Sequence, residues 1–306
     1  MKNLSKIILF ATAILFFACK PPEVEHPLSS DPVQRTILIE EFTGDQCVYC
    51  PWGADAISAS IEGNENKAIV VCHHVGYNED KYTISKSRPL TFFYGGTTFA
   101  PACMIDRTII PEVDDEDVSP VFFPSYLPQP KLKASIINKM IEVPSYVTVN
   151  IKHSFNAATR ELIVDISGEL RQDYPNARIN VYIIQEELVG QQVGPVNQTT
   201  GEYVPSQNAS STTVGGTIQN YSHKHVVRAA LAETAWGDIL DVTKGKYSKS
   251  YAYEIPTSIK GVKGVEIPAD VSQMYIVAFV ADYIKNSKDN LDKSKVHNAA
   301  IKKIVE

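Results

Sequence analysis

The sequence predicts two domains of different classes, an α/β domain over residues 36–143 and an all-β domain over residues 144–306. Three observations lead to this prediction. The chain has 306 residues, of which 44% are hydrophobic, and this is enough to build two separate cores. In the first half, short apolar runs typical of strands alternate with a segment of helical periodicity. From Tyr146 onward, apolar residues repeat with a period of two, which is typical of antiparallel strands.

Composition and charge exclude several classes of protein. The chain carries 29 Lys and Arg against 35 Asp and Glu, so its formal net charge of -6 argues against a protein that binds nucleic acid through its phosphates. The hydrophobic and charged fractions are those of a folded globular protein. Five cysteines are an odd number, so at least one of them lies outside any internal disulfide.

Residues 1–18 predict an export signal. An apolar run over residues 7–17 is too short for a transmembrane helix and suits the core of a signal peptide. The sequence Phe16-Phe17-Ala18-Cys19 resembles a bacterial lipoprotein box, which implies cleavage before Cys19 and acylation of its thiol. Residues 19–35, rich in proline, serine and charge, then predict a tether. An ordinary secretory signal with a leftover cysteine is the alternative.

The motif Cys47-Val48-Tyr49-Cys50 stands between a predicted strand at residues 36–42 and a predicted helix that stops at Gly63. Two intervening residues at the start of a helix let both sulfurs approach, and the free amides there stabilise a thiolate on Cys47. Cys47 would attack a substrate disulfide and Cys50 would resolve it. A purely structural disulfide is the alternative, because exported proteins live in an oxidising compartment.

The order of elements around this motif resembles the thioredoxin fold. A second apolar run follows at residues 67–75, and Ala100-Pro101-Ala102-Cys103 precedes a third strand. The resemblance implies that Pro101 is cis and packs beside the dithiol, and that the backbone of Ala100 pairs with an extended substrate polypeptide. We assign Trp52, which directly follows the motif and its proline, to the same substrate-binding group.

Glu41 lies six residues before the motif and matches the buried acid that the thioredoxin family uses to move protons to and from the resolving cysteine. Burial would raise the pKa of this carboxyl and let it act as a base toward Cys50, while strand alternation sends Glu40 to the other face. We expect Cys72 and Cys103 to be buried free thiols. No second cysteine pair stands at zinc-finger spacing, so we predict no metal and no other cofactor.

The second half predicts about seven strands, the number expected of an antiparallel β-sandwich of immunoglobulin-like size. Residues 191–222 interrupt this pattern with about thirty residues dominated by Gly, Ser, Thr, Asn and Gln. We expect a long loop here, either disordered or in contact with a partner or glycan.

Several stretches together resemble the outer-membrane-protein-28-related lipoproteins of Bacteroidetes. They are the lipoprotein signal, residues 40–51, the segment from Pro101 to Arg107, and residues 223–228 and 296–299. The resemblance implies a lipid-anchored outer-membrane protein that faces the periplasm or the cell surface, in a family first described as a surface antigen.

Two functions are compatible with these observations. The first is an envelope thiol-disulfide oxidoreductase that acts on disulfide-containing or extended polypeptides. The second is a non-enzymatic lipoprotein of adhesin or receptor type, with a surface protein or glycan as its ligand and a structural disulfide at Cys47 and Cys50.

Overall fold

The structure is a computed structural model, and it describes residues 28–306 except residues 77, 95–97, 114–118, 126–129 and 285–292. The predicted signal peptide, Cys19 and the first part of the predicted tether lie outside the described residues. The helical segments are α1 (Cys50–Ile61), η1 (Ser85–Tyr94), α2 (Ala134–Glu142), η2 (Ser206–Asn208) and η3 (Val271–Gln273).

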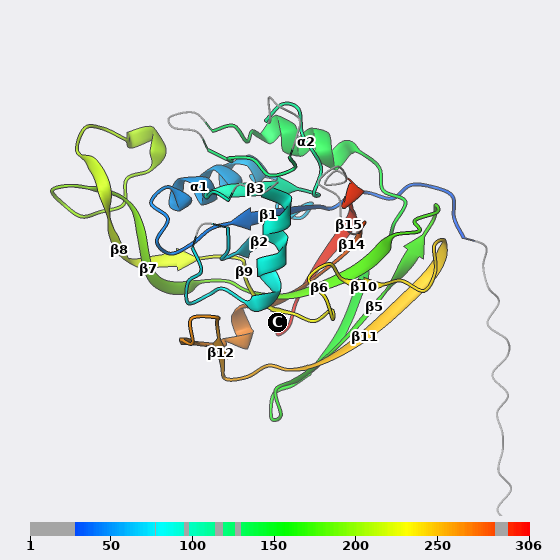
Figure 1. The fold of residues 1–306 in the computed structure, drawn as a ribbon. Coiled ribbons are helices and arrows are strands. Elements are labelled where there is room, and N and C mark those ends of the chain that lie inside the picture. Colours follow the sequence, from blue (N-terminus) through cyan, green and yellow to red (C-terminus); the bar gives the residue numbers. More distant parts are fainter. Residues whose placement is uncertain (1–27, 77, 95–97, 114–118, 126–129, 285–292) are drawn as a thin grey trace, which may run out of the picture.

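Most of the described strands belong to one mixed sheet, in the order β15-β14-β6-β9-β2-β1-β3, with β10 paired to β6 (Figure 1). Its members are β1 (Ile37–Phe42), β2 (Ala68–His73), β3 (Ala102–Ile105), β6 (Ala177–Gln185), β9 (Val226–Ala230), β10 (Asp238–Ile239), β14 (Met274–Asp282) and β15 (Val296–Lys303). The smaller sheets comprise β4 (Asn150–Asn156), β5 (Glu161–Leu170), β7 (Leu188–Asn197), β8 (Thr213–His223), β11 (Gly245–Glu254), β12 (Ser258–Lys260) and β13 (Glu266–Pro268).

One face of the main sheet carries two covering layers side by side. Over β1, β2 and β3, residues such as Ile37 and Ile39 pack against Ile57 of α1 and Ile137 of α2. Over β6 and β14, the three-stranded sheet β11-β5-β4 forms the second layer. Because paired residues of neighbouring strands project to the same face, the register from β1 through β2 and β9 to β6 puts both layers on one side. The opposite face packs against η1 and the segments around it.

The prediction of a thioredoxin-like domain followed by a separate immunoglobulin-like sandwich is wrong. The local order of strand, disulfide, helix and parallel strand is present, but β1, β2 and β3 do not form a sheet of their own. Strand β9, from the second half of the chain, pairs with β2 in parallel and with β6 in antiparallel fashion. Strands from both halves therefore form one sheet, and strand predominates over helix.

The physical reason for this error lies in the strands β6 and β14. Both are buried along nearly their whole length, including Tyr182 and Ile184 between the apolar residues that suggested a period of two. A near-continuous apolar run is typical of a central strand that is covered on both faces. The alternation of Ile179, Val181 and Ile183 predicts one face of a sandwich, but Tyr182 and Ile184 of the same strand are also buried against neighbouring residues.

Local sequence explains where α1 begins and ends. Pro51 occupies the first turn, where its missing N–H costs no hydrogen bond, and Gly63 follows the last turn with a φ of 80°. Gly53 lies against Pro101, and a Cβ at this position would meet the Pro101 Cβ at 2.4 Å. The helix can therefore pack directly on Pro101 only because residue 53 has no side chain.

Candidate functional site

The two cysteines of the motif form a disulfide at the start of α1. The Cys47–Cys50 bond has an S–S distance of 2.13 Å and joins Cα atoms 5.4 Å apart. Cys50 is the first residue of the helix, and Cys47 lies in the preceding turn, where its N–H donates to Gly44 O. Both cysteines are almost completely covered, with exposed fractions of 3% for Cys47 and 2% for Cys50. The disulfide is therefore placed for thiol chemistry but is shielded from solvent.

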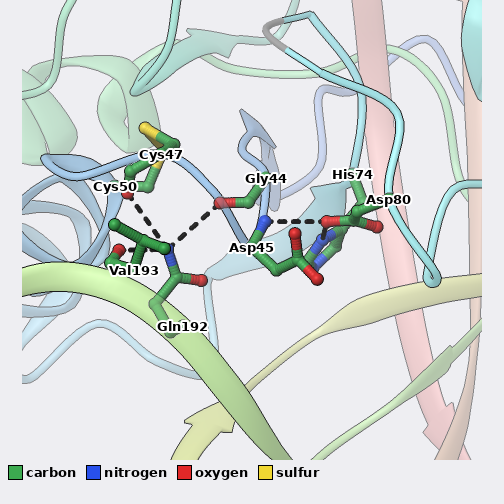
Figure 2. The surroundings of a disulfide bond; sticks show 8 residues. All are labelled: Gly44, Asp45, Cys47, Cys50, His74, Asp80, Gln192 and Val193. Carbon is green, nitrogen blue, oxygen red and sulfur yellow. Dashed lines mark hydrogen bonds and ion pairs between the residues drawn. A yellow bond between two sulfur atoms is a disulfide. The ribbon is translucent and has the colours of Figure 1, made fainter. Parts of the chain in front are cut away.

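A β-hairpin covers this turn, in the segment where we expected a long loop. Strands β7 and β8 pair in antiparallel fashion from Leu188 opposite His223 to Asn197 opposite Thr213. The Gln192 side chain donates to the carbonyl oxygens of Gly44 (3.1 Å) and Cys47 (3.0 Å). Figure 2 shows Gln192 and Val193 next to the disulfide turn. The hairpin therefore covers the backbone of the turn that carries the disulfide.

Further hydrogen bonds hold the hairpin against the turn and α1. The Val193 N–H donates to Asp45 O at 2.7 Å, and the Trp52 indole donates to Val204 O at 2.7 Å. Nearer the hairpin end, the Tyr203 hydroxyl donates to the Asp55 carboxylate. Trp52, assigned from sequence to substrate binding, is buried and contacts a segment of its own chain instead of lying open.

The remaining residues assigned from sequence converge on the same end of the sheet. The Ala100–Pro101 peptide bond is cis, the conformation that the thioredoxin resemblance implies, and Pro101 contacts Gly53 of α1. Ala100 is half-buried. Glu41 lies on β1 with its side chain on the α1 side of the sheet, because it alternates with Ile37 and Ile39. The structure therefore brings the disulfide, Pro101 and Glu41 together around the first turns of α1.

Glu41 is enclosed by two cysteines, one from each neighbouring strand. It stands opposite Cys72 of β2 and Cys103 of β3 in the sheet register. Burial raises the pKa of Glu41 to about 7, although the charges of His225 and His74 and a hydrogen bond with Cys72 oppose this rise. A carboxyl with such a pKa can accept and release a proton near neutral pH.

Cys72 and Cys103 are free and buried, which confirms the prediction made for both thiols. Burial raises the pKa of each thiol well above its usual value, and the nearby Glu41 charge adds to the rise. Because only a thiolate is a strong nucleophile, neither of them is poised to react.

The buried carboxylate of Asp80 holds the turn before Cys47 through a backbone hydrogen bond. The Asp80 carboxylate accepts a hydrogen bond from the Asp45 N–H (2.8 Å) and lies 2.6 Å from His74 Nδ1 (Figure 2). Burial works against ionisation of Asp80, but His74 and the backbone donors outweigh it and lower the pKa of this carboxyl. Among the described residues, no group of three or more His, Cys, Asp or Glu side chains is placed to hold a metal ion.

Sequence reasoning missed the hairpin and its contacts with the disulfide turn. The segment is rich in Gly, Thr and Gln, and much of β8 is exposed, so its composition resembles that of a loop. One signal was present, since Val189 and Val193, and later Val214 and Ile218, recur at spacings that a strand allows. Nothing in a single sequence shows that these two stretches pair across the intervening residues.

Two kinds of comparison identify relatives. The model of the family described as outer membrane protein Omp28 matches residues 94–302, which is more than half of the chain. No protein among the curated ones matches. Of the helices in the described part of the chain, none has the length and apolarity needed to cross a membrane.

Two solved structures are similar to this chain. HBP35 of Porphyromonas gingivalis matches with a TM-score of 0.56 and 18% identity, over 89% of this chain and 76% of that one. An Agrobacterium tumefaciens protein matches over 90% of this chain and 97% of its own, with 13% identity and a TM-score of 0.44, which is too low to support an argument. The likeness to HBP35 concerns the fold alone. On the strength of the family model, whose name points to the outer membrane, the chain belongs to the outer membrane protein Omp28 family.

Proposed function

We propose that this protein is an outer-membrane lipoprotein, anchored through Cys19, whose Cys47–Cys50 disulfide exchanges with thiols of polypeptide partners. One observation supports the exchange chemistry above all others. The disulfide begins α1 on the same side of the sheet as Glu41, a buried carboxyl whose pKa lies at about 7. This combination supplies an electron acceptor, a helix N-terminus that stabilises a thiolate, and a proton donor.

The reaction needs no cofactor, because the disulfide itself takes up two electrons. A partner thiolate attacks the Cys47 sulfur, a bond forms between these two sulfurs, and the Cys47–Cys50 bond breaks. Cys50 leaves as a thiolate and takes a proton from the Glu41 carboxyl. A second thiolate of the partner then attacks the partner sulfur of the mixed disulfide, releasing Cys47 and leaving the partner oxidised. The reverse sequence would reduce a partner disulfide.

Exchange with a polypeptide requires the hairpin to move. Both sulfurs are almost fully covered, and Gln192 ties the hairpin to the carbonyl of Cys47. In the proposed function, the partner enters when β7 and β8 lift from the turn, and its extended backbone then pairs beside Ala100. Such local opening costs less free energy than global unfolding, because much of β8 is exposed.

A trapping experiment tests the proposal. Cys50→Ala, expressed in a native envelope, leaves Cys47 without its resolving partner, so we expect Cys47-dependent mixed disulfides on non-reducing gels. The matched control is the Cys47→Ala, Cys50→Ala double variant, which should trap nothing. A reduction potential within the working range of the envelope should accompany trapping. Absence of trapped partners together with a potential far below that range would reject the exchange function.

The burial of both cysteines favours a second function, in which the disulfide is structural and the protein is a binding lipoprotein. Burial of both cysteines beside an ordered hairpin is what a structural disulfide would show, and the protein would then be a binding lipoprotein of adhesin or receptor type for a surface protein or glycan. In that case, Cys50→Ala would lower stability without trapping partners.

The anchor and its orientation have their own test. Cys19→Ser should release the protein from the membrane fraction, and retention there would reject acylation at this residue. An impermeant label applied to intact cells would then show whether the protein faces outward or into the periplasm.

A further inference from the structure

A groove runs along α1 under the hairpin and consists of two connected cavities. The outer cavity, of about 860 Å³, lies between α1, β2 and the hairpin residues around Tyr203. The inner cavity, of about 260 Å³, reaches Glu41 and His74. The residues shared by both linings are Asp55, Ser58, Ile61, Val70 and His225. Because the linings overlap in this way, the two cavities form one passage from the surface to the buried end of the sheet.

We propose that this groove binds an extended, basic segment of a polypeptide. The inference goes beyond the exchange function, because binding here needs neither reduction nor opening of the disulfide. The partner is a polypeptide segment that carries lysine or arginine side chains among apolar ones.

The charges of the outer cavity support a cationic ligand. Its lining includes Asp55, Glu62, Glu65 and Glu186, and among the described lining residues there is no Lys or Arg. The only basic group there, His225, already lies 2.6 Å from the Glu186 carboxylate. Because the outer cavity carries one sign of charge beside an apolar wall, it attracts ligands of the opposite sign, whereas the inner cavity is lined by Lys224 as well as Glu41.

The floor of the same cavity is apolar. Ile61, Ala68 and Val70 contribute to it and belong to the core beneath α1. Lys and Arg side chains carry aliphatic stems that pack on such a surface while their charged ends reach a carboxylate rim. A small inorganic cation would leave this floor uncovered, so the combination favours an extended organic cation.

The inner end offers an independent sign of a ligand. His74 is 2% exposed and lines the inner cavity, and its Nε2 has no hydrogen-bond partner. Its Nδ1 faces the Asp80 carboxylate at 2.6 Å, so that nitrogen carries the donated hydrogen. A polar group of the backbone of an extended peptide would satisfy the Nε2 nitrogen at this end of the groove.

The test measures binding of a labelled peptide that alternates lysine and alanine to the full-length, oxidised protein by fluorescence anisotropy. We expect Glu62→Gln with Glu65→Gln to weaken binding about five- to tenfold, since two ion pairs are lost at an exposed rim. Glu65 accepts a hydrogen bond from the Gly63 N–H, and neither carboxyl forms a hydrogen bond or ion pair with the described residues of the hairpin. The matched control is Glu161→Gln with Glu254→Gln, which removes the same charge from exposed positions on β5 and β11 and should leave the affinity unchanged.

Two further measurements sharpen the result. Ser58→Leu should block the junction of the two cavities without changing charge, and we expect weaker binding from it as well. Spermine, a cation without a peptide backbone, should bind more weakly than the peptide. Equal binding of the lysine-acetylated peptide, equal losses in the test and control pairs, or spermine binding as tightly as the peptide would each overturn the proposal. All of these measurements use the intact disulfide, so they succeed or fail independently of the trapping experiment.

Discussion

The two faces of β1 carry neighbouring glutamates that have opposite properties. Glu40 and Glu41 are 1% and 5% exposed, so burial alone would raise the pKa of both. Glu40 points away from α1 and accepts two hydrogen bonds from the Arg107 guanidinium, at 2.7 and 2.9 Å. Although burial opposes it, this pairing lowers the pKa of Glu40 to about 2. No guanidinium of the described residues is hydrogen-bonded to Glu41, and burial outweighs the charges of His225 and His74, so its pKa rises to about 7.

The difference in pKa indicates that Glu40 is a structural carboxylate and that Glu41 is suited to proton transfer. Arg107 is fully buried, lies over the rings of Phe93 of η1 and Phe279 of β14, and pairs with Glu40 of β1. A carboxylate held in this way stays charged at every physiological pH and serves stability. A buried carboxyl whose pKa lies near 7 keeps its proton exchangeable near neutrality, which is the property expected of a group that takes part in catalysis. We therefore expect chemistry on the α1 side of β1, where Glu41 and the disulfide lie.

The largest expected effect comes from breaking the pair on the structural face. Arg107→Met leaves the buried Glu40 charge with only His73 Nε2, 3.4 Å away, beside it, so we expect a loss of about 3 to 5 kcal/mol in the free energy of unfolding. Urea denaturation at pH 7 measures it. The double variant Glu40→Gln with Arg107→Met removes the stranded charge and should recover part of that stability. If the double variant were less stable than the single one, the stranded charge would not be the cause.

The contrast between the faces could be predicted only in part. Strand alternation over Ile37 to Phe42 correctly separated Glu40 from Glu41, because the period of two is a local property of the chain. The disulfide at the start of α1 was equally local. The Arg107 partner of Glu40 lies 67 residues away, and no spacing rule predicts such a pair.

Long-range pairing also explains the other errors. Burial of β6 and β14 on both faces depends on which strands flank them, and the hairpin over Cys47 depends on contacts between residues about 145 positions apart. A single sequence contains the periodicity of each strand, but it does not contain the list of its neighbours. The fold class was therefore wrong while the order of local elements around the disulfide was correct.

The next largest effect is the pH dependence of the free energy of unfolding that Glu41 causes. The folded pKa of Glu41 is about 7, above the ordinary value of 4.5, so its stabilising effect is complete below pH 4.5 and is lost as pH rises through 7. The shift corresponds to roughly 3 kcal/mol. Glu41→Gln cannot ionise, so we expect the wild type to lose about 3 kcal/mol relative to this variant between pH 4.5 and 8. Parallel stability curves for the two proteins would contradict the high pKa of Glu41.

The hairpin is expected to have a smaller effect, confined to the disulfide side. Gln192→Ala removes the hydrogen bonds to Gly44 O and Cys47 O, so we expect a loss of about 1 to 2 kcal/mol in hairpin docking. The rate at which a water-soluble phosphine reduces the disulfide should rise about tenfold, if reduction proceeds through local opening. The control is Gln191→Ala, an exposed neighbour whose side chain donates to Gln219 Oε1. Equal rates in wild type and Gln192→Ala would mean that the hairpin does not limit access.

The smallest expected effect tests whether Cys72 tunes Glu41. The hydrogen bond between them favours the charged carboxylate, so Cys72→Ala should raise the pKa of Glu41 still further, by about half a unit. A carbon-13 NMR titration of the Glu41 carboxyl measures this. Cys103→Ala is the matched control, because it removes a buried thiol from the opposite neighbouring strand that makes no such hydrogen bond in the structure. If both variants moved the pKa equally, loss of packing around the carboxyl would explain the change. A shift specific to Cys72→Ala would show that the two flanking thiols are not equivalent, although burial and strand register make them look alike.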